Sequence, residues 1–275
     1  MKKGKVLLKI PYFSIFFLLF VTIFIYFGGY FYNASAYLID KHSILLSPSF
    51  SHPFGTDRLG RDLLARVIEG GKISLGIGVG SSLITSFIGL IVGISAGFFQ
   101  KTADKVIVII IDLFLTFPTF FLLLALVSYI NASVWVLIFV ISVTGWMGMA
   151  RMIRSESFEI ASKPYIKILK LANVSNMKII FKYFTPLLAP IFFISFTFGV
   201  GGAILAESGL SFLGIGITPP QMSWGTILNE GKAVIDIAWW VSFFPGLFIF
   251  LVIFSLVNIS DFLQHKTNKK DNVIS

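Results

Sequence analysis

The residue types that bind nucleotides and metal ions are present in this chain, but they are not spaced as such sites require. The nearest approach to a phosphate-binding Gly-x-x-x-x-Gly-Lys-Ser/Thr loop is Gly70–Ser74, which lacks the first glycine and adjoins an apolar stretch. The histidines His42, His52 and His265 lie far apart in sequence, and there is no cysteine. We therefore expect no catalytic residue, no metal site and no cofactor, and we expect that the chain is not an enzyme.

A basic interval, Met149–Pro190, interrupts a chain that is otherwise mostly apolar. It holds seven of the 22 basic residues but only two acidic residues, Glu156 and Glu159. A segment of this kind between two apolar stretches can present side chains to a soluble partner. We interpret it as a docking surface on one side of a membrane.

The first element predicted inside this interval is a short surface helix. Pro164 is tolerated in the first turn of a helix, where its missing N–H has no partner to lose. Tyr165–Ala172 then mixes apolar residues with lysines in the manner of an amphipathic helix. Asn173 should end this helix, because asparagine accepts the left-handed backbone conformation that follows many helices.

A second short helix is predicted over Asn176–Phe184, with Ser175 as its N-cap. Thr185 and Pro186 should then be the N-cap and first residue of a long apolar helix. The interval thus contains two short helices on one side of the membrane, between two membrane spans.

A polar segment, Asn33–Lys72, carries a second group of charged residues in the motif His52–Asp62. Asp57, Arg58, Arg61 and Asp62 are spaced to pair across one helical turn. We interpret this part as an interfacial helix with its own ion pairs, and a role in gating a ligand is the alternative. The residues singled out in the motif are Gly55, Thr56, Asp57, Gly60, Arg61 and Asp62.

A third segment, Glu207–Gly216, directly follows the apolar stretch Leu187–Ala206. Pro219-Pro220 then breaks any helix. Apolar sequence broken by glycine and proline can form a re-entrant or interfacial piece that lines a translocation path. A plain surface loop is the alternative. The candidate path residues are Glu207, Ser208, Leu210, Ser211, Phe212, Gly214 and Gly216. The tryptophans Trp224, Trp239 and Trp240 suit the outer interfacial belt of a membrane protein.

The elements that must position these groups are membrane spans. The chain has 275 residues, of which 56% are hydrophobic and 16% aromatic, as in an all-α polytopic membrane protein. Six apolar stretches are long enough to cross a bilayer of about 30 Å. They are Tyr12–Tyr32, Ile73–Phe99, Val106–Ile130, Val134–Ala150, Leu187–Ala206 and Ala238–Ile259.

The distribution of charge assigns the two sides of the membrane. With six spans, the two termini, Gln100–Lys105 and Met149–Pro190 share one side, which holds 16 of the 22 basic residues. The positive-inside rule makes this side cytoplasmic and accounts for the net charge of +9 without nucleic acid. The basic N-terminal segment Met1–Pro11 resembles a signal peptide, but no small-residue cleavage site follows, so we expect an uncleaved first span.

Two features concern the spans themselves. Gly76/Gly80, Gly89/Gly93 and Gly93/Gly97 are small-xxx-small pairs, which allow close contact between helices. Asp112 lies early in the third span, with Pro118 after it. An acidic residue in a span is usually paired or functional. We expect a structural partner for Asp112, such as an arginine of the basic interval, and a proton relay is the alternative.

These motifs, taken in order, resemble those of the permease subunits of binding-protein-dependent ABC importers, of the dipeptide, oligopeptide and nickel "C" type. His52–Asp62 is similar to the family's His-Pro-Phe-Gly-Thr-Asp-x-x-Gly-Arg-Asp signature. Glu207–Gly216, with the prolines that follow, is similar to its Glu-x-x-Leu-Ser-Phe-Leu-Gly-x-Gly…Pro-Pro stretch. Asp112 with Pro118, Trp224-Gly225 and the segment from Trp239 to Gly246 also match. The resemblance implies the MetI-like fold of type I importers, with both termini in the cytoplasm.

Within the resemblance, Tyr165–Pro190 takes the place of the family's EAA loop, which inserts into a groove of the ATPase subunit. The usual Glu-Ala-Ala falls at Lys167–Leu169 and the usual glycine at Asn173. The bulkier helix that results should fit a correspondingly larger groove. The residues that the resemblance assigns to ATPase coupling are Tyr165, Lys167, Ile168, Leu169, Leu171, Ala172, Asn173, Ser175 and Pro186.

The resemblance also implies the partners. They are a homologous second permease chain, two cytoplasmic ABC ATPases, an extracytoplasmic solute-binding protein and the surrounding lipid bilayer, with no nucleic acid. The expected location is the cytoplasmic membrane of a bacterium. The expected cargo is peptides or nickel and other metal chelates, because no residue pattern separates these classes.

The expected organisation has three parts. Residues 1–72 form a cytoplasmic tail, the first span and an extracytoplasmic segment; residues 73–260 form the permease domain with its coupling loop at 150–186; residues 261–275 form a cytoplasmic tail. One alternative function is a secondary transporter driven by an ion gradient, which would need intramembrane charges around broken helices. A membrane scaffold that transports nothing is a second alternative.

Overall fold

The computed structural model describes residues 10–130 and 132–274, and its regular elements there are helices. They are α1 (Tyr12–Phe31), α2 (Leu63–Phe99), α3 (Lys101–Leu115), α4 (Thr119–Ser128), α5 (Val134–Ser162), α6 (Pro164–Leu171), α7 (Asn176–Ile179), a π-helical segment (Ile180–Phe184), α8 (Thr185–Phe212), α9 (Trp224–Lys232) and α10 (Trp240–Ile274). The lysines of the expected N-terminal tail, Lys2, Lys3, Lys5 and Lys9, lie outside the described residues.

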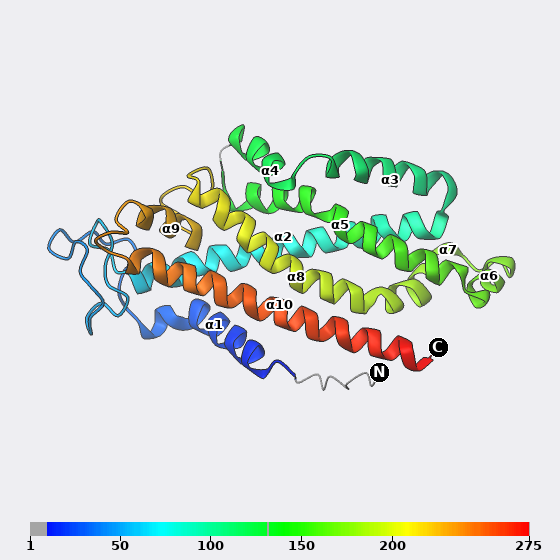
Figure 1. Ribbon diagram of the computed structural model, residues 1–275, viewed down its shortest axis with the longest axis horizontal. Coiled ribbons are helices and arrows are strands. Elements are labelled where there is room, and N and C mark those ends of the chain that lie inside the picture. The colour runs from blue at the N-terminus through cyan, green and yellow to red at the C-terminus, as the bar shows by residue number, and fades with distance from the viewer. Residues whose placement is uncertain (1–9, 131, 275) are drawn as a thin grey trace, which may run out of the picture.

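The long helices run roughly along one axis and place the two polar regions at opposite ends. Figure 1 shows the segment between α1 and α2, together with α9, at one end, and α6 and α7 at the other. Five helical stretches are long and apolar enough to cross a membrane, and α3 with α4 forms a sixth, bent crossing. Because α2 ends and α5 begins at opposite ends of the bundle, α3 and α4 together must make this crossing (Figure 1).

The third span is not the continuous helix predicted over Val106–Ile130. It divides into α3 and α4, whose axes differ by 77°. The break falls at residues 116–118, because proline lacks an N–H and disfavours helical backbone in the residue before it. Pro118 then precedes the first residue of α4.

Several other boundaries differ from the prediction, since helices continue beyond the apolar stretches. The predicted interfacial helix and the second span form a single helix, α2, and Asp62 caps it by accepting a hydrogen bond from the Ala65 N–H (2.9 Å). Helix α5 continues through the first part of the basic interval, and α8 includes Glu207–Phe212. The last helix, α10, runs on into the expected tail at 261–275.

The glycines of α2 allow close packing against α5, as predicted for two of the three pairs. A Cβ atom at Gly93 would lie 2.6 Å from Cβ of Ile153, and one at Gly89 would lie 2.9 Å from Cβ of Met149. Gly97 meets Ser157 in the same way. These contacts, one helical turn apart, join α2 and α5 into one unit. The prediction is wrong for Gly76, where an added Cβ atom would lie within 4 Å of no atom of another described helix.

The difference in packing between Gly93 and Gly76 leads to a prediction about stability. We expect Gly93→Ala to lower the free energy of unfolding by about 1–3 kcal/mol, because a Cβ atom cannot rotate away from Ile153 and the helices must separate. Gly76→Ala is the matched control on the same helix, and its gain in helix propensity should leave stability equal or higher. Unfolding by sodium dodecyl sulfate, followed by tryptophan fluorescence, measures both. Equal effects of the two substitutions would contradict this account of the α2–α5 contact.

Two of the tryptophans expected in the interfacial belt are core residues instead. Trp224 is fully buried and donates its indole N–H to the Val67 carbonyl (2.9 Å). Trp240 is also buried and donates to the Thr56 carbonyl (3.2 Å). Only Trp239 of the three is exposed. Trp224 and Trp240 therefore bind α9 and α10 to the start of α2 and the motif before it.

Candidate functional site

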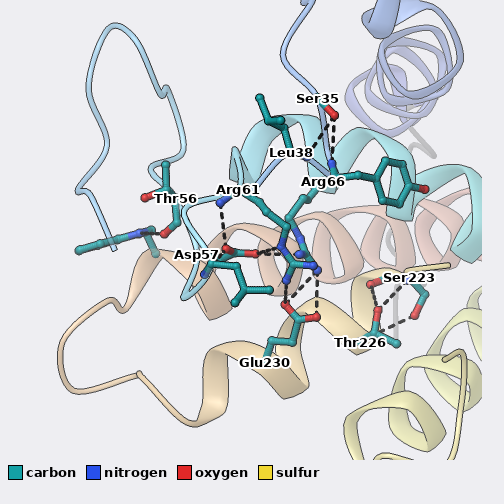
Figure 2. Close-up of polar contacts among 12 residues, drawn as sticks. Ser35, Leu38, Thr56, Asp57, Arg61, Arg66, Ser223, Thr226 and Glu230 are labelled. Carbon is teal, nitrogen blue, oxygen red and sulfur yellow. Dashed lines mark hydrogen bonds and ion pairs between the residues drawn. The ribbon is translucent and has the colours of Figure 1, made fainter. Parts of the chain in front are cut away.

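The motif His52–Asp62 builds an ion-pair network at the end of the bundle that the charge distribution predicts to be extracytoplasmic, and Figure 2 shows the side chains of this network converging. Arg66 of α2 donates through Nη1 to Asp57 (2.7 Å) and through Nη2 to Glu230 of α9 (2.9 Å to Oε2). Arg61 also contacts both carboxylates, Asp57 at 2.7 Å and Glu230 at 2.9 Å. The network thus joins the motif and the start of α2 to α9, which is more than 160 residues further along the chain.

Burial distinguishes the members of this network. The side chains of Asp57 and Arg66 are 2% and 1% exposed, whereas those of Arg61 and Glu230 are 17% and 27% exposed. Burial raises the pKa of the Glu230 carboxyl, and the charge of Arg61 acts in the opposite direction. Two carboxylates and two guanidinium groups balance each other, so the network has no net formal charge.

The backbone of the motif explains its residue types. Asp57 Oδ1 accepts hydrogen bonds from the N–H groups of Leu59 and Arg61, which closes a tight turn. Gly60 occupies this turn with a φ of +74°, in the left-handed region that favours glycine. Gly55 has a φ of +77°, and the Thr56 hydroxyl accepts from the Leu46 N–H (2.8 Å). The turn places the Asp57 carboxylate within hydrogen-bonding distance of both arginines.

The sequence identified part of this network and missed part of it. Asp57 and Arg61 do pair, but in a turn that precedes α2 and not across a helical turn. Asp62 does not join them: it caps α2 and also accepts a hydrogen bond from the Tyr32 hydroxyl (2.7 Å). Arg66 and Glu230 were not singled out. The sequence did offer a signal for this pair: Arg66 and Glu230 have opposite charges and lie in segments that were assigned to the same side of the membrane.

Glu207 lies in the last part of α8 and is fully buried. Its carboxylate accepts hydrogen bonds from Ser211 on the same helix (2.7 Å) and from Ser74 of α2 (3.1 Å). The Ser74 hydroxyl in turn accepts a hydrogen bond from the backbone N–H of Trp224 (3.1 Å). In this structure Glu207 therefore connects α2, α8 and α9 through hydroxyl groups.

The other candidate path residues divide between the core and the surface. Ser208, Leu210, Ser211 and Gly216 are buried, whereas Phe212 and Gly214 are exposed. Ser211 and Gly214 line a cavity that Arg61, Arg66 and Glu230 also line. The structure thus brings two of the candidate path residues to the same cavity as Arg61 of the motif His52–Asp62. That these residues line a translocation path stays a prediction.

At the opposite end of the bundle, which the charge distribution predicts to be cytoplasmic, α6 has the amphipathic character that its sequence predicted. Ile166 is fully buried, while Ile168 and Leu171 are 64% and 83% exposed. Lys167, Ala172 and Ser175 are also exposed. A short helix that turns large apolar side chains outward has the composition of a contact surface.

The turn after α6 is a Schellman motif. Asn173 has a φ of +54°, which confirms the predicted left-handed conformation. Its N–H donates to the Lys170 carbonyl (3.2 Å), and the Val174 N–H donates to the Leu169 carbonyl (3.1 Å). The backbone direction after α6 is therefore set by this one residue.

The connection from this turn to α8 differs from the prediction. Ser175 occupies the N-cap position of α7, but its side chain makes no capping hydrogen bond. Thr185 is not an N-cap, because the π-helical segment leads directly into α8 and the Thr185 hydroxyl donates to the Ile180 carbonyl (3.2 Å). Pro186 does lie in the first turn of α8. The second short helix and the fifth span are consequently one continuous helical unit.

Helix α6 also packs onto the end of α2. Ile166 belongs to a buried cluster with Phe98 and Ile94 of α2 and Ile153 of α5. Lys170 donates to the Phe98 carbonyl (3.3 Å) and lies 4.1 Å from the centre of the Phe98 ring. A cation near the last carbonyls of a helix is favourable. The contact surface on α6 is thus attached to α2 as well as to α5 and α8.

The predicted structural partner of Asp112 is found. Arg151 of α5 donates through Nη2 to Asp112 of α3 (2.6 Å), and both side chains are more than half exposed. Arg154 and Asp104 form a second ion pair between the same helices. Among the described residues there is no group of three or more side chains that could hold a metal ion.

Comparison with known proteins gives consistent results. Residues 89–269 match the family model described as "Binding-protein-dependent transport system inner membrane component". The oligopeptide transport system permease protein OppC of Haemophilus influenzae is 31% identical over 94% of this chain and 84% of its own length. The dipeptide transport system permease protein DppC of Bacillus subtilis is 36% identical over 82% of this chain and 71% of its own.

A solved structure shares the fold. An inward-facing conformation of the MetNI methionine ABC transporter superposes with a TM-score of 0.56 and 16% sequence identity, over 72% of this chain and 95% of the transporter chain. At that identity the likeness concerns the helical architecture alone. It agrees with the MetI-like fold expected from the sequence.

Proposed function

This chain belongs to the family of binding-protein-dependent transport system inner membrane components, and from that premise we propose that it moves peptides across the cytoplasmic membrane. Members of this family are permease subunits of ABC importers, which are translocation components and not enzymes. The observation that carries the proposal is the similarity to oligopeptide and dipeptide permeases over most of the chain. Nickel and other metal chelates, the other cargo that the sequence left open, have no comparable support.

We further propose that α6 and the Asn173 turn bind a separate ATPase subunit. The support is the exposed apolar face of α6, formed by Ile168 and Leu171, at the end of the bundle that the positive-inside rule makes cytoplasmic. The complete importer would contain a homologous second permease, two ATPases and an extracytoplasmic solute-binding protein. ATP-driven movement of the ATPases would reach α5 and α8 directly through the chain, and α2 through Ile166 and Lys170.

ATP hydrolysis by the affinity-purified complex tests the function. The complex is assayed alone and with its solute-binding protein, charged either with peptides or with nickel chelates. Stimulation by peptides supports the proposal, whereas stimulation by nickel chelates alone would replace peptides as the cargo. If no ATPase co-purifies and no hydrolysis is seen, a transporter driven by an ion gradient becomes the better explanation.

A substitution on α6 tests the docking surface. We expect Ile168→Asp to weaken ATPase binding about tenfold or more, because a carboxylate placed in an apolar contact must lose its hydration. Thr102→Asp, at an exposed position in the first turn of α3 at the same end of the bundle, makes the same change of charge outside the surface. Pull-down of the ATPase with each variant gives the comparison. An unchanged amount of ATPase with Ile168→Asp would exclude this face of α6.

A further inference from the structure

A cavity of about 350 Å³ lies beside the ion-pair network at the extracytoplasmic end. Its walls come from the motif, the start of α2, the end of α8, the α8–α9 connection and α9. Arg61, Arg66 and Glu230 line it, together with Ser211, Gln221 and Asn229. The volume is within the range of small-molecule sites, and the polar residues can donate and accept hydrogen bonds.

The charged groups in this wall still have capacity to bind. The Nε–H of Arg66 is buried and has no hydrogen-bond partner among the residues that the structure describes, which is uncommon for a guanidinium group in a protein interior. Arg61 contacts Asp57 and Glu230 through Nε and Nη2, and neither contact uses its Nη1 group. Arg61 and Glu230 are also the two members of the network with exposed surface. The wall therefore presents one positive and one negative group beside each other.

We propose that this cavity is a subsite for the charged ends of a short peptide, with Arg61 binding the carboxylate and Glu230 binding the ammonium group. The inference rests on the proposed function, since it specifies where the cargo of that function first contacts this subunit.

Charge balance selects a zwitterion over a simple anion or cation. The four groups of the network carry no net formal charge, so an added anion or cation would leave a partly buried site with an unbalanced charge, which is costly. A peptide with both ends free adds one charge of each sign. A guanidinium group can bind a carboxylate through two parallel hydrogen bonds, and the amides of Gln221 and Asn229 can bind the peptide bond.

Direct binding to the intact importer, reconstituted in nanodiscs without the solute-binding protein, tests the subsite. The probes are alanyl-alanine with free ends, its N-acetylated form and its C-amidated form, observed by saturation-transfer difference NMR. We expect the free peptide to bind at least threefold more tightly than either blocked form. Equal binding of all three, or no binding of the free peptide, would overturn the proposal.

Two variants test the assigned groups. Glu230→Gln keeps a hydrogen-bonding side chain but leaves the network with one excess positive charge, so the N-acetylated, anionic form should become the preferred probe. Gln221→Glu, at an exposed position on the cavity wall, adds one excess negative charge, so the C-amidated, cationic form should become the preferred probe. Gln221→Glu supplies the test even if Glu230→Gln does not fold. Asn33→Asp is the control, an exposed amide before the motif and outside this cavity.

Transport by the same complex, reconstituted in sealed vesicles with the solute-binding protein added, separates this inference from the proposed function. Peptide import without any preference for free ends would overturn the subsite alone. Absence of both import and ATP hydrolysis in a folded complex would overturn the proposed function.

Discussion

Replacing Arg66 by methionine is expected to lower the free energy of unfolding by about 3 kcal/mol or more. Methionine fills much of the same volume, but it leaves the buried Asp57 carboxylate and the partly buried Glu230 carboxylate without one of their two arginines. Removing one member of a buried ion pair costs about 3–5 kcal/mol, because the remaining charge has lost its hydration without compensation. Unfolding by sodium dodecyl sulfate in detergent measures the effect.

The control for this prediction is Arg58→Met, which removes the same charge from the same motif. Arg58 is exposed, and surface substitutions usually change stability by less than about 0.5 kcal/mol. The double variant Arg66→Met, Glu230→Met should recover part of the loss, because it removes one unpaired carboxylate as well. If Arg66→Met and Arg58→Met have equal effects, the network does not stabilise this end of the bundle.

The features that could be predicted from the sequence are those set by nearby residues. The left-handed turn at Asn173 follows from a local conformational preference, and a close helix contact at Gly93 follows from spacing along one helix, although its partner α5 does not. The pairing of Arg66 with Glu230 could not be found in this way, because these residues are 164 positions apart. Their contact depends on which segments the fold brings together at the end of the bundle.

Helix boundaries were missed for a related reason. The apolar stretches mark what the bilayer requires, whereas the helices continue as far as backbone hydrogen bonds and packing allow. Helix α2 begins before its apolar stretch because Asp62 caps it and Val67 accepts a hydrogen bond from the buried Trp224. The burial of Trp224 likewise depends on tertiary contacts, and composition alone placed it in the interfacial belt.

Helix α2 connects the end of the molecule that holds the ion-pair network to the end that holds α6. Its 37 residues span about 55 Å at 1.5 Å per residue. Arg66 joins its first part to α9, and Phe98 joins its last turn to α6 through Lys170. Because the glycines of α2 also pack it closely against α5, we expect a displacement of α6 to move the ion-pair network or to break one of these contacts.

The largest functional effect is expected for Asn173→Pro, which should abolish ATP-driven transport while leaving membrane insertion intact. Proline requires a φ near −65°, whereas residue 173 has a φ of +54°. Proline also lacks the N–H that donates to the Lys170 carbonyl. The Schellman turn cannot form, so α6 must change its direction relative to α8, and its outward face can no longer meet the ATPase while Ile166 stays packed against α2.

Asn173→Gly is the matched control, since glycine adopts the left-handed conformation about 1–2 kcal/mol more readily than other residues. We expect this variant to transport as well as the unaltered protein. Uptake of labelled peptide by reconstituted vesicles gives the comparison, and fractionation of the membranes checks insertion. Normal uptake by Asn173→Pro would show that the geometry of this turn is not needed for coupling. Equal loss of uptake in both variants would mean that the asparagine side chain, and not the backbone conformation, is the essential feature.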